Sequence, residues 1–202
     1  MKVVLATKNA GKAAEIREIL SSTGLEFLTL DDFSNIGLPP ETGDTFRENA
    51  AAKARFVAQK TGLLALADDS GLEVAVLRGR PGVLSARYSG PESTDEKNIE
   101  KLIHELKDVP EYKRQARFVC VIAFASPGGK VRTFEGRLDG FIAQTPSGKE
   151  GFGYDPVFFA PTLNKTLAEA PMAEKNKISH RKEALEKLRT WIFGKGGLTE
   201  NF

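Results

Sequence analysis

Apolar residues recur with two different periods along this chain of 202 residues. An apolar run over residues 3–6 leads into a polar segment over 7–12, after which Ala13, Ile16 and Leu20 follow at the spacing of one helix face. The pattern predicts a short strand, a polar turn and an amphipathic helix, in that order. Lys12 is then expected in the first turn of this helix.

A second helix is predicted to begin after Thr45, because Glu48 follows it at the spacing of a capping box, and to run through about Gln59. Residues 63–67 then form an apolar run that is typical of a buried strand. This run leads directly into the polar segment 68–71, where we expect the strand to give way to a loop.

The rest of the chain alternates between the same two periods. Ser93 and Glu96 form another capping box, and they open a helix with an apolar stripe that Pro110 terminates. Further expected elements are a hairpin of strands over 115–125 and 131–137, strands over 138–143 and 157–160, a last helix over 184–192 and a loose tail over 194–202. Helices mixed with hairpin-linked and crossover-linked strands indicate an α/β or α+β architecture with a mixed sheet between helices.

The composition is that of an ordinary globular protein, with 41% hydrophobic residues, 28% charged residues and a formal net charge of +2. These values exclude a disordered chain, a collagen-like fibre and a charge-driven wrapper of nucleic acid. At this length we expect one domain that spans residues 1–202. The single cysteine, Cys120, excludes an intramolecular disulfide and a cysteine-rich zinc site, and two histidines exclude a three-histidine metal centre.

Neither a signal segment nor a membrane span is expected. The apolar stretch at the N-terminus is soon interrupted by polar residues, and no apolar run approaches the ~20 residues that cross a bilayer. We therefore expect a cytoplasmic protein with no membrane partner.

Four polar clusters interrupt the apolar pattern, and the first of them covers residues 7–15. A strand-to-helix turn with a lysine in the first helical turn suits a phosphate group, because helix N-termini carry partial positive charge. The segment is not a Walker P-loop, since Ala6 and Ala13 replace the glycine and the hydroxyl residue of that motif. In the alternative interpretation Lys12 is a solvated residue that pairs with Glu15, three positions away.

The second cluster contains Asp68 and Asp69, directly after five apolar residues. Successive side chains of a strand point to opposite faces, so only one of the two can face a given site if the strand persists. One carboxylate could then hold magnesium or take a proton from water. The alternative is an Asx-type turn that ends the strand.

The third and fourth clusters lie near the C-terminal end. Residues 151–156 combine two glycines, two aromatic rings and an acid, which suits either a hinge that stacks on a flat base or a tight turn with two core aromatics. The third glycine of a dinucleotide fingerprint is absent. Lys175, Lys177, His180 and Arg181 precede the last helix, either as a solvated face or as donors to a phosphate or a base. The four clusters together suit phosphoryl chemistry on a nucleotide.

Six segments resemble, in order, the signatures of the inosine triphosphate pyrophosphatase family, whose members are also called noncanonical purine NTP pyrophosphatases or dITP/XTP pyrophosphatases. The segments are 7–15, 45–50, 67–72, 81–88, 151–156 and 178–181, and the resemblance spans residues 3–193. It implies an α/β fold with an elongated mixed sheet flanked by helices, in two lobes around a central cleft. It also implies magnesium-dependent hydrolysis of ITP, dITP and XTP to the monophosphate and pyrophosphate by a homodimer.

The resemblance assigns a role to each matching residue. Asp69 would be the general base and a magnesium ligand, and Glu41 would be a second carboxylate on the metal. The triphosphate would be held by Thr7, Lys8, Asn9, Ala10, Gly11 and Lys12. Further substrate contacts would come from Ser70, Phe152, Gly153, Tyr154, Asp155, Lys175, His180 and Arg181. Lys8 stands where many members carry a small residue such as glycine.

In the mechanism that we expect, water attacks the α-phosphorus in line and pyrophosphate leaves, while Lys12 and Lys175 neutralise charge. A donor near the 6-position of the base, from His180, Arg181 or backbone, would donate a hydrogen bond to the carbonyl oxygen of inosine or xanthosine and would be left facing the amine donors of adenosine.

Two alternatives remain open at this point. One is a pyrophosphatase of the similarly built septum-formation-inhibitor family, which acts on modified pyrimidine nucleotides. The other is a noncatalytic nucleotide or RNA binder that uses the cationic turns, although the near-neutral charge balance disfavours bulk affinity for nucleic acid.

Overall fold

The computed structural model describes residues 1–194, so the predicted tail beyond Gly194 lies outside the described residues. One mixed sheet contains seven strands in the order β2-β1-β3-β4-β5-β6-β7. Strand β1 is parallel to β2 and β3, whereas β6 is antiparallel to β5 and β7. The strands are β1 (Lys2–Leu5), β2 (Glu26–Leu28), β3 (Leu64–Val74), β4 (Gln115–Ala125), β5 (Val131–Ile142), β6 (Phe158–Ala160) and β7 (Lys165–Thr166).

The α-helices that accompany the sheet are α1 (Ala10–Ile19), α2 (Phe46–Thr61), α3 (Asp95–Glu105), α4 (Met172–Ile178) and α5 (His180–Phe193). The α/β fold with a mixed sheet and helices is therefore confirmed. None of the helices in the described part of the chain has the length and apolar character of a membrane span.

The chain divides into two compact units. Unit 1 comprises Met1–Asp69, Cys120–Gly136 and the chain from Arg181 onward, and unit 2 comprises Ser70–Val119 and Arg137–His180. Strands β3, β4 and β5 each contribute residues to both units. The prediction of a single domain over residues 1–202 stays a prediction.

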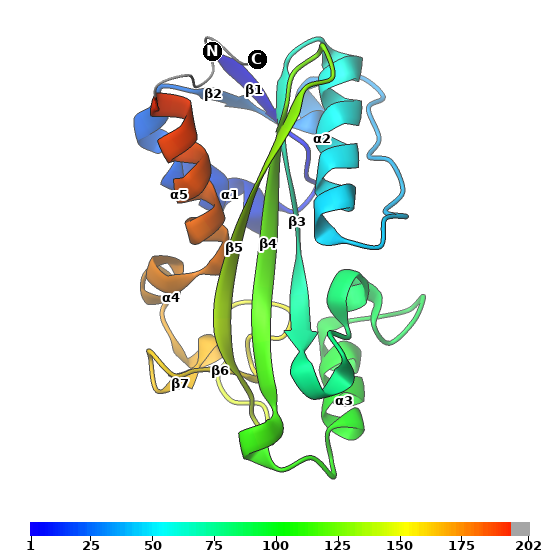
Figure 1. The fold of residues 1–202 in the computed structure, drawn as a ribbon, viewed down its shortest axis with the longest axis vertical. Helices are drawn as coiled ribbons and strands as arrows, with labels where there is room; N and C mark the ends of the chain where they lie inside the picture. Colours follow the sequence, from blue (N-terminus) through cyan, green and yellow to red (C-terminus); the bar gives the residue numbers. More distant parts are fainter. Residues whose placement is uncertain (195–202) are drawn as a thin grey trace. The chain divides into compact units, whose positions relative to one another are not determined.

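In unit 1 the helices lie on both faces of strands β1 and β3 (Figure 1). Leu5 and Leu66 pack with residues of α1 and α5, including Ile16 and Leu185, in one apolar cluster. Ala65 alternates with Leu66 along β3, so it faces the other side, where Figure 1 shows α2. In unit 1, Leu64 and Leu66 of β3 therefore lie on the side of α1 and α5, and Ala65 lies on the side of α2.

Unit 2 has its own core around α3 and the distal parts of the long strands. Leu102 and Leu106 are fully buried in a cluster that also contains Phe118, Phe158 and Tyr154. The apolar stripe predicted for this helix is thus a packing face. Tyr154 also donates its hydroxyl hydrogen to the backbone oxygen of Ser85, over 2.8 Å, inside this core.

Several local predictions were wrong in detail. The strand that leads into Asp68 does not end there but continues as β3 through Val74. The N-cap of α3 is Thr94 and not Ser93, because the Thr94 hydroxyl accepts from Lys97 N–H whereas the Ser93 hydroxyl donates to the Ala86 oxygen. That helix ends at Glu105, ahead of Pro110.

The two strands expected over 131–137 and 138–143 form one continuous strand, β5, which lies between β4 and β6 in the sheet. A further difference concerns the fourth polar cluster. Lys175 and Lys177 lie in a short helix, α4, that the apolar pattern did not indicate, and His180 and Arg181 begin α5 rather than precede it.

Candidate active site

Asp68 and Asp69 lie in the middle of strand β3, and each has its own set of cationic partners in unit 1. Both carboxylates are buried. By the alternation of the strand, Asp68 faces the side of α1 and α5, and Asp69 faces the side of α2. The interpretation as an Asx turn is therefore wrong, because the strand persists and separates the two acids.

Asp69 shares a buried ammonium group with Glu41. Lys53, on α2, places its Nζ atom 2.9 Å from Asp69 Oδ1 and 2.6 Å from Glu41 Oε1. Burial raises the pKa of Asp69 to about 6, the Lys53 charge opposes this rise, and the Glu41 charge adds to it. A carboxylate with a pKa near 6 can accept a proton from water close to neutral pH.

Asp68 is held between two cations on the opposite face. Lys12 Nζ lies 3.0 Å from Asp68 Oδ2, and Arg181 Nη2 lies 3.3 Å from the same oxygen. Burial alone would raise the pKa of Asp68, but the charges of Lys12, Arg181 and Lys53 hold it well below its usual range. Asp68 is thus a permanently charged acid, which suits it to hold cationic side chains in place rather than to exchange protons.

Arg181 also joins helix α5 to helix α1. Its Nη1 atom lies 2.5 Å from Glu15 Oε2, and both side chains are almost completely buried. The interpretation in which Glu15 pairs with Lys12 is therefore wrong: Glu15 pairs with Arg181, and Lys12 pairs with Asp68. These two pairs join the N-terminal half of α1 to strand β3 and helix α5.

The charges of this group favour an additional cation. The seven side chains comprise four carboxylates and three cations, namely Glu15, Glu41, Asp68, Asp69, Lys12, Lys53 and Arg181. Within residues 1–194 no cluster of three or more His, Cys, Asp or Glu side chains is arranged to hold a metal by itself. Magnesium in nucleotide sites, however, is commonly bound by one or two carboxylates together with substrate phosphates and water. Asp69 and Glu41, which converge on one ammonium group, fit that mode.

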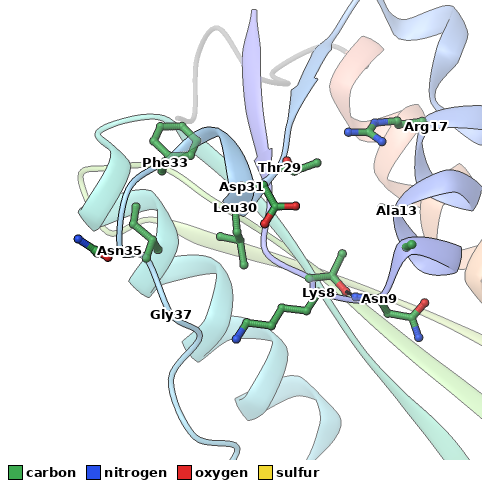
Figure 2. A pocket seen from close by; sticks show the side chains of 13 residues that line it. Lys8, Asn9, Ala13, Arg17, Thr29, Leu30, Asp31, Phe33, Asn35 and Gly37 are labelled. Atoms are coloured by element: carbon green, nitrogen blue, oxygen red, sulfur yellow. Dashed lines mark hydrogen bonds between the residues drawn. The ribbon is translucent and has the colours of Figure 1, made fainter.

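The turn before α1 is organised by its own side chains. The Thr7 hydroxyl accepts from Asn9 N–H over 3.1 Å, and the Asn9 side-chain oxygen accepts from Lys12 N–H over 3.0 Å, which makes Asn9 the N-cap of α1. Lys12 lies in the first helical turn, as predicted. Residues of this turn line a pocket of about 970 Å³ that is bounded on its other side by the segment 29–37 (Figure 2).

The remaining residues of the predicted site lie in unit 2. Asp155 and Lys175 form a buried ion pair, and the Lys175 ammonium also lies 4.6 Å from the centre of the Phe152 ring. Asp155 also accepts from Phe152 N–H over 3.0 Å. Gly151 has φ +83°, and a Cβ atom there would collide with the Asp155 carboxylate, so this tight turn requires glycine. Phe152 is exposed, whereas Tyr154 is part of the core of unit 2.

Two further predicted residues in unit 2 are Ser70 and His180. Ser70 follows Asp69 in strand β3 and is half-buried. The His180 ring is stacked on Phe118, with the ring centroids 5.0 Å apart. The interpretation of the last cationic run as a solvated face is wrong for Lys175, His180 and Arg181, which are buried, and holds for Lys177, which is exposed.

One residue of the charged cluster was not recognised from the sequence, and the role of another was left open. Lys53 was missed although it lies in the apolar stripe of its helix, between Ala50 and Val57, and a lysine at such a position indicates a buried partner. Asp68 was not assigned a role, because the sequence alone does not tell which of two consecutive strand residues faces which helix.

The fold and these residues define an α/β protein with a buried acid–base cluster of a kind suited to a metal-bound phosphate substrate. The chain belongs to the Ham1 family, whose model matches residues 3–191. A dITP/XTP pyrophosphatase of Halalkalibacterium halodurans is 49% identical, over 94% of this chain and 97% of the relative. The resemblance to the inosine triphosphate pyrophosphatase family is confirmed.

Solved structures agree with this placement. A HAM1 protein from Coxiella burnetii has a TM-score of 0.88 and 45% identity, over 94% of this chain and 97% of that chain. The Staphylococcus aureus Ham1 protein has a TM-score of 0.88 and 38% identity, over 96% of this chain and 100% of that chain.

Proposed function

We propose that this protein hydrolyses noncanonical purine nucleoside triphosphates (ITP, dITP and XTP) to the nucleoside monophosphate and pyrophosphate. The names of relatives that are nearly half identical over almost the whole chain support the reaction and the substrate class. The observation that carries the chemistry is Asp69, a buried acid with a raised pKa that shares Lys53 with a second carboxylate. The biological role would be to cleanse the nucleotide pool.

Asp69 is the general base in this proposal. It orients a water molecule, or accepts a proton from it, as the water oxygen bonds to the α-phosphorus. The bond between the α-phosphorus and its bridging oxygen breaks, and its electron pair leaves with pyrophosphate. Lys53 keeps Asp69 and Glu41 close together, and it lowers the pKa of Asp69 below the value that burial alone would give.

The cofactor of this proposal is magnesium, held by Asp69 and Glu41. When bound, it neutralises charge on the phosphate oxygens. The excess of carboxylates over cations in the cluster supports a divalent ion.

The substrate contacts that we propose come from the turn 7–12, for the triphosphate, and from a further set of residues in the segment 70–181. The members of that set are Ser70, Phe152, Gly153, Tyr154, Asp155, Lys175, His180 and Arg181. Phe152 is the best candidate to stack on a base because its ring is exposed. A hydrogen-bond donor from His180 or from nearby backbone would select bases that carry a carbonyl oxygen at the 6-position. Arg181, whose partners are Glu15 and Asp68, is suited to position Asp68.

We also propose a homodimer, as the family resemblance implies, and a location in the cytoplasm. A two-fold assembly is the commonest form for such proteins. A single buried cysteine without a disulfide partner is compatible with a reducing compartment.

The proposed reaction is tested with a panel of nucleotides in the presence and absence of magnesium. Pyrophosphate release is measured for ITP, dITP, XTP, GTP and ATP, and for dUTP, dTTP and a methylated UTP. We expect release from the first three at rates far above the others and only with the metal. Comparable rates for ITP and ATP would contradict the proposed selectivity, and a preference for pyrimidines would favour the septum-formation-inhibitor type of activity.

A further inference from the structure

The buried cations of unit 1 are paired with carboxylates, so they do not by themselves balance the negative charge of a triphosphate. Lys12 is paired with Asp68, Lys53 with Asp69 and Glu41, and Arg181 with Asp68 and Glu15. Four carboxylates thus face three cations in this cluster. Magnesium at Asp69 and Glu41 would add positive charge beside these carboxylates, and other cationic residues of the chain can add charge for the distal phosphates.

The pocket of about 970 Å³ beside the turn 7–12 supplies such charge. Lys8 on the turn and Arg17 on α1 line it, and neither forms an ion pair with a carboxylate in the described part of the chain. Arg17 is close enough to Asp32 to contribute to the lowered pKa of that acid, but Asp32 is already engaged by Thr29 N–H and by the Thr29 hydroxyl, at 2.6 and 3.0 Å.

The other wall of the pocket is mostly uncharged. Thr29 and Asn35 contribute polar groups, Phe33 contributes an aromatic ring, and Asp31 contributes the single carboxylate among the lining residues (Figure 2). The lining residues thus include two cations and one anion, while Asp32 lies near Arg17 without lining the pocket. This balance is opposite to that of the acidic cluster, and it favours an anionic ligand.

The pocket begins on the turn that also carries Lys12. Lys8 and Asn9 line the pocket, and Lys12, which follows on the same turn, pairs with Asp68 at the acidic cluster. We propose that this pocket binds pyrophosphate through Lys8 and Arg17, first as the distal part of the triphosphate substrate and then as the released product. This inference rests on the proposed function and names Arg17 as a binding residue that no sequence motif indicated.

The test is calorimetric titration of the full chain with inorganic pyrophosphate, in EDTA and without nucleotide. Lys8→Ala and Arg17→Ala are each expected to weaken binding by about tenfold, the effect of losing one hydrogen bond to a charged group. Asp31→Asn is expected to strengthen binding by a few fold, because it removes the repelling charge. Circular dichroism checks that each variant is folded, as expected for exposed positions.

Matched controls are Arg55→Ala, an exposed arginine on helix α2, and Lys130→Ala, an exposed lysine in a turn, neither of which lines the pocket. If Lys8→Ala and Arg17→Ala bind as the controls do, or if Asp31→Asn does not bind more tightly, the pocket is not a pyrophosphate site. The titration contains no substrate. A failure of the proposed hydrolysis, which the nucleotide panel would reveal, is therefore separable from a failure of this inference.

Discussion

Asp68 and Asp69 are consecutive residues of strand β3 whose carboxylates have different cationic partners and opposite shifts in pKa. Asp68 pairs with Lys12 and Arg181, and Asp69 pairs with Lys53. Neighbouring residues of a strand face opposite sides, so Asp68 holds cationic side chains on one face and Asp69 is placed for proton transfer on the other.

The first prediction contrasts the two aspartates by substitution. Asp69→Asn is expected to remain folded and to lose turnover by roughly 10²–10⁴-fold, the usual contribution of a general base. Asp68→Asn is expected to lower the free energy of unfolding by about 3–5 kcal/mol, because it removes the carboxylate shared by two buried or half-buried cations. Steady-state kinetics and urea denaturation of both variants check this. If Asp69→Asn kept nearly wild-type turnover, Asp69 would not be the general base.

A second prediction concerns the pH dependence of stability without metal. The folded pKa of Asp69, about 6, lies above its ordinary value of 3.8, so the folded state binds this proton more tightly than the unfolded state. The stabilisation is complete below pH 3.8 and is lost as the pH rises through about 6, by up to about 3 kcal/mol.

Denaturation of the wild type and Asp69→Asn in EDTA between pH 4 and pH 7 measures this effect. The asparagine variant should gain stability relative to the wild type as the pH rises. Asp68 has a lowered folded pKa, so its stabilisation is lost as the pH falls from about 5. This contribution is present in both proteins and cancels in their difference. A constant difference between the two proteins would show that Asp69 titrates normally.

Lys53 provides a third prediction. Lys53→Met removes the cation that lowers the pKa of Asp69 and leaves two neighbouring carboxylates without their shared partner. The acidic limb of the pH–rate profile should move to higher pH, and maximal turnover should fall. The matched control is Lys60→Met, an exposed lysine in the last turn of the same helix, which should leave the profile unchanged. A profile of Lys53→Met that coincides with the control would mean that Lys53 does not tune Asp69.

In unit 2 the buried pair of Lys175 and Asp155 yields a prediction about stability. Lys175→Met is expected to destabilise the protein by about 3–5 kcal/mol, because it leaves a buried carboxylate without its ammonium partner. The double variant Lys175→Met/Asp155→Asn should recover part of this loss, since no charge is then buried. Thermal or urea denaturation of the two single variants and the double variant gives the coupling energy. Purely additive effects would show that the pair is not coupled.

Removal of divalent ions gives a fifth prediction. EDTA should abolish release of pyrophosphate from ITP, and magnesium in excess should restore it. Glu41→Gln should raise the magnesium concentration needed for half-maximal rate, because one of the two proposed carboxylate ligands becomes neutral. An unchanged magnesium requirement in this variant would assign the second ligand to another residue.

Much of the local structure followed from the sequence alone, since it depends on neighbours in the chain. The pattern of apolar residues located β1, α1, β4 and α5, and the capping box at Thr45 located α2. The motifs also indicated the family and most of the polar residues that we propose for the site. The boundaries at Ser93 and at 137–138 were wrong. The Ser93 hydroxyl donates to the Ala86 backbone oxygen and leaves Thr94 to cap the helix, and Val131–Ile142 forms one continuous strand.

Tertiary structure decided which side chains meet. The sequence left open whether β3 ends at Asp68, and the strand persists because Lys12, Arg181 and Lys53 offset the cost of burying two carboxylates. Those partners come from α1, α5 and α2, far apart in the chain, and no local period encodes their distances. The residue types were therefore fixed by sequence, while the pairing of charges, and with it the difference between Asp68 and Asp69, arose only when helices packed on both faces of one strand.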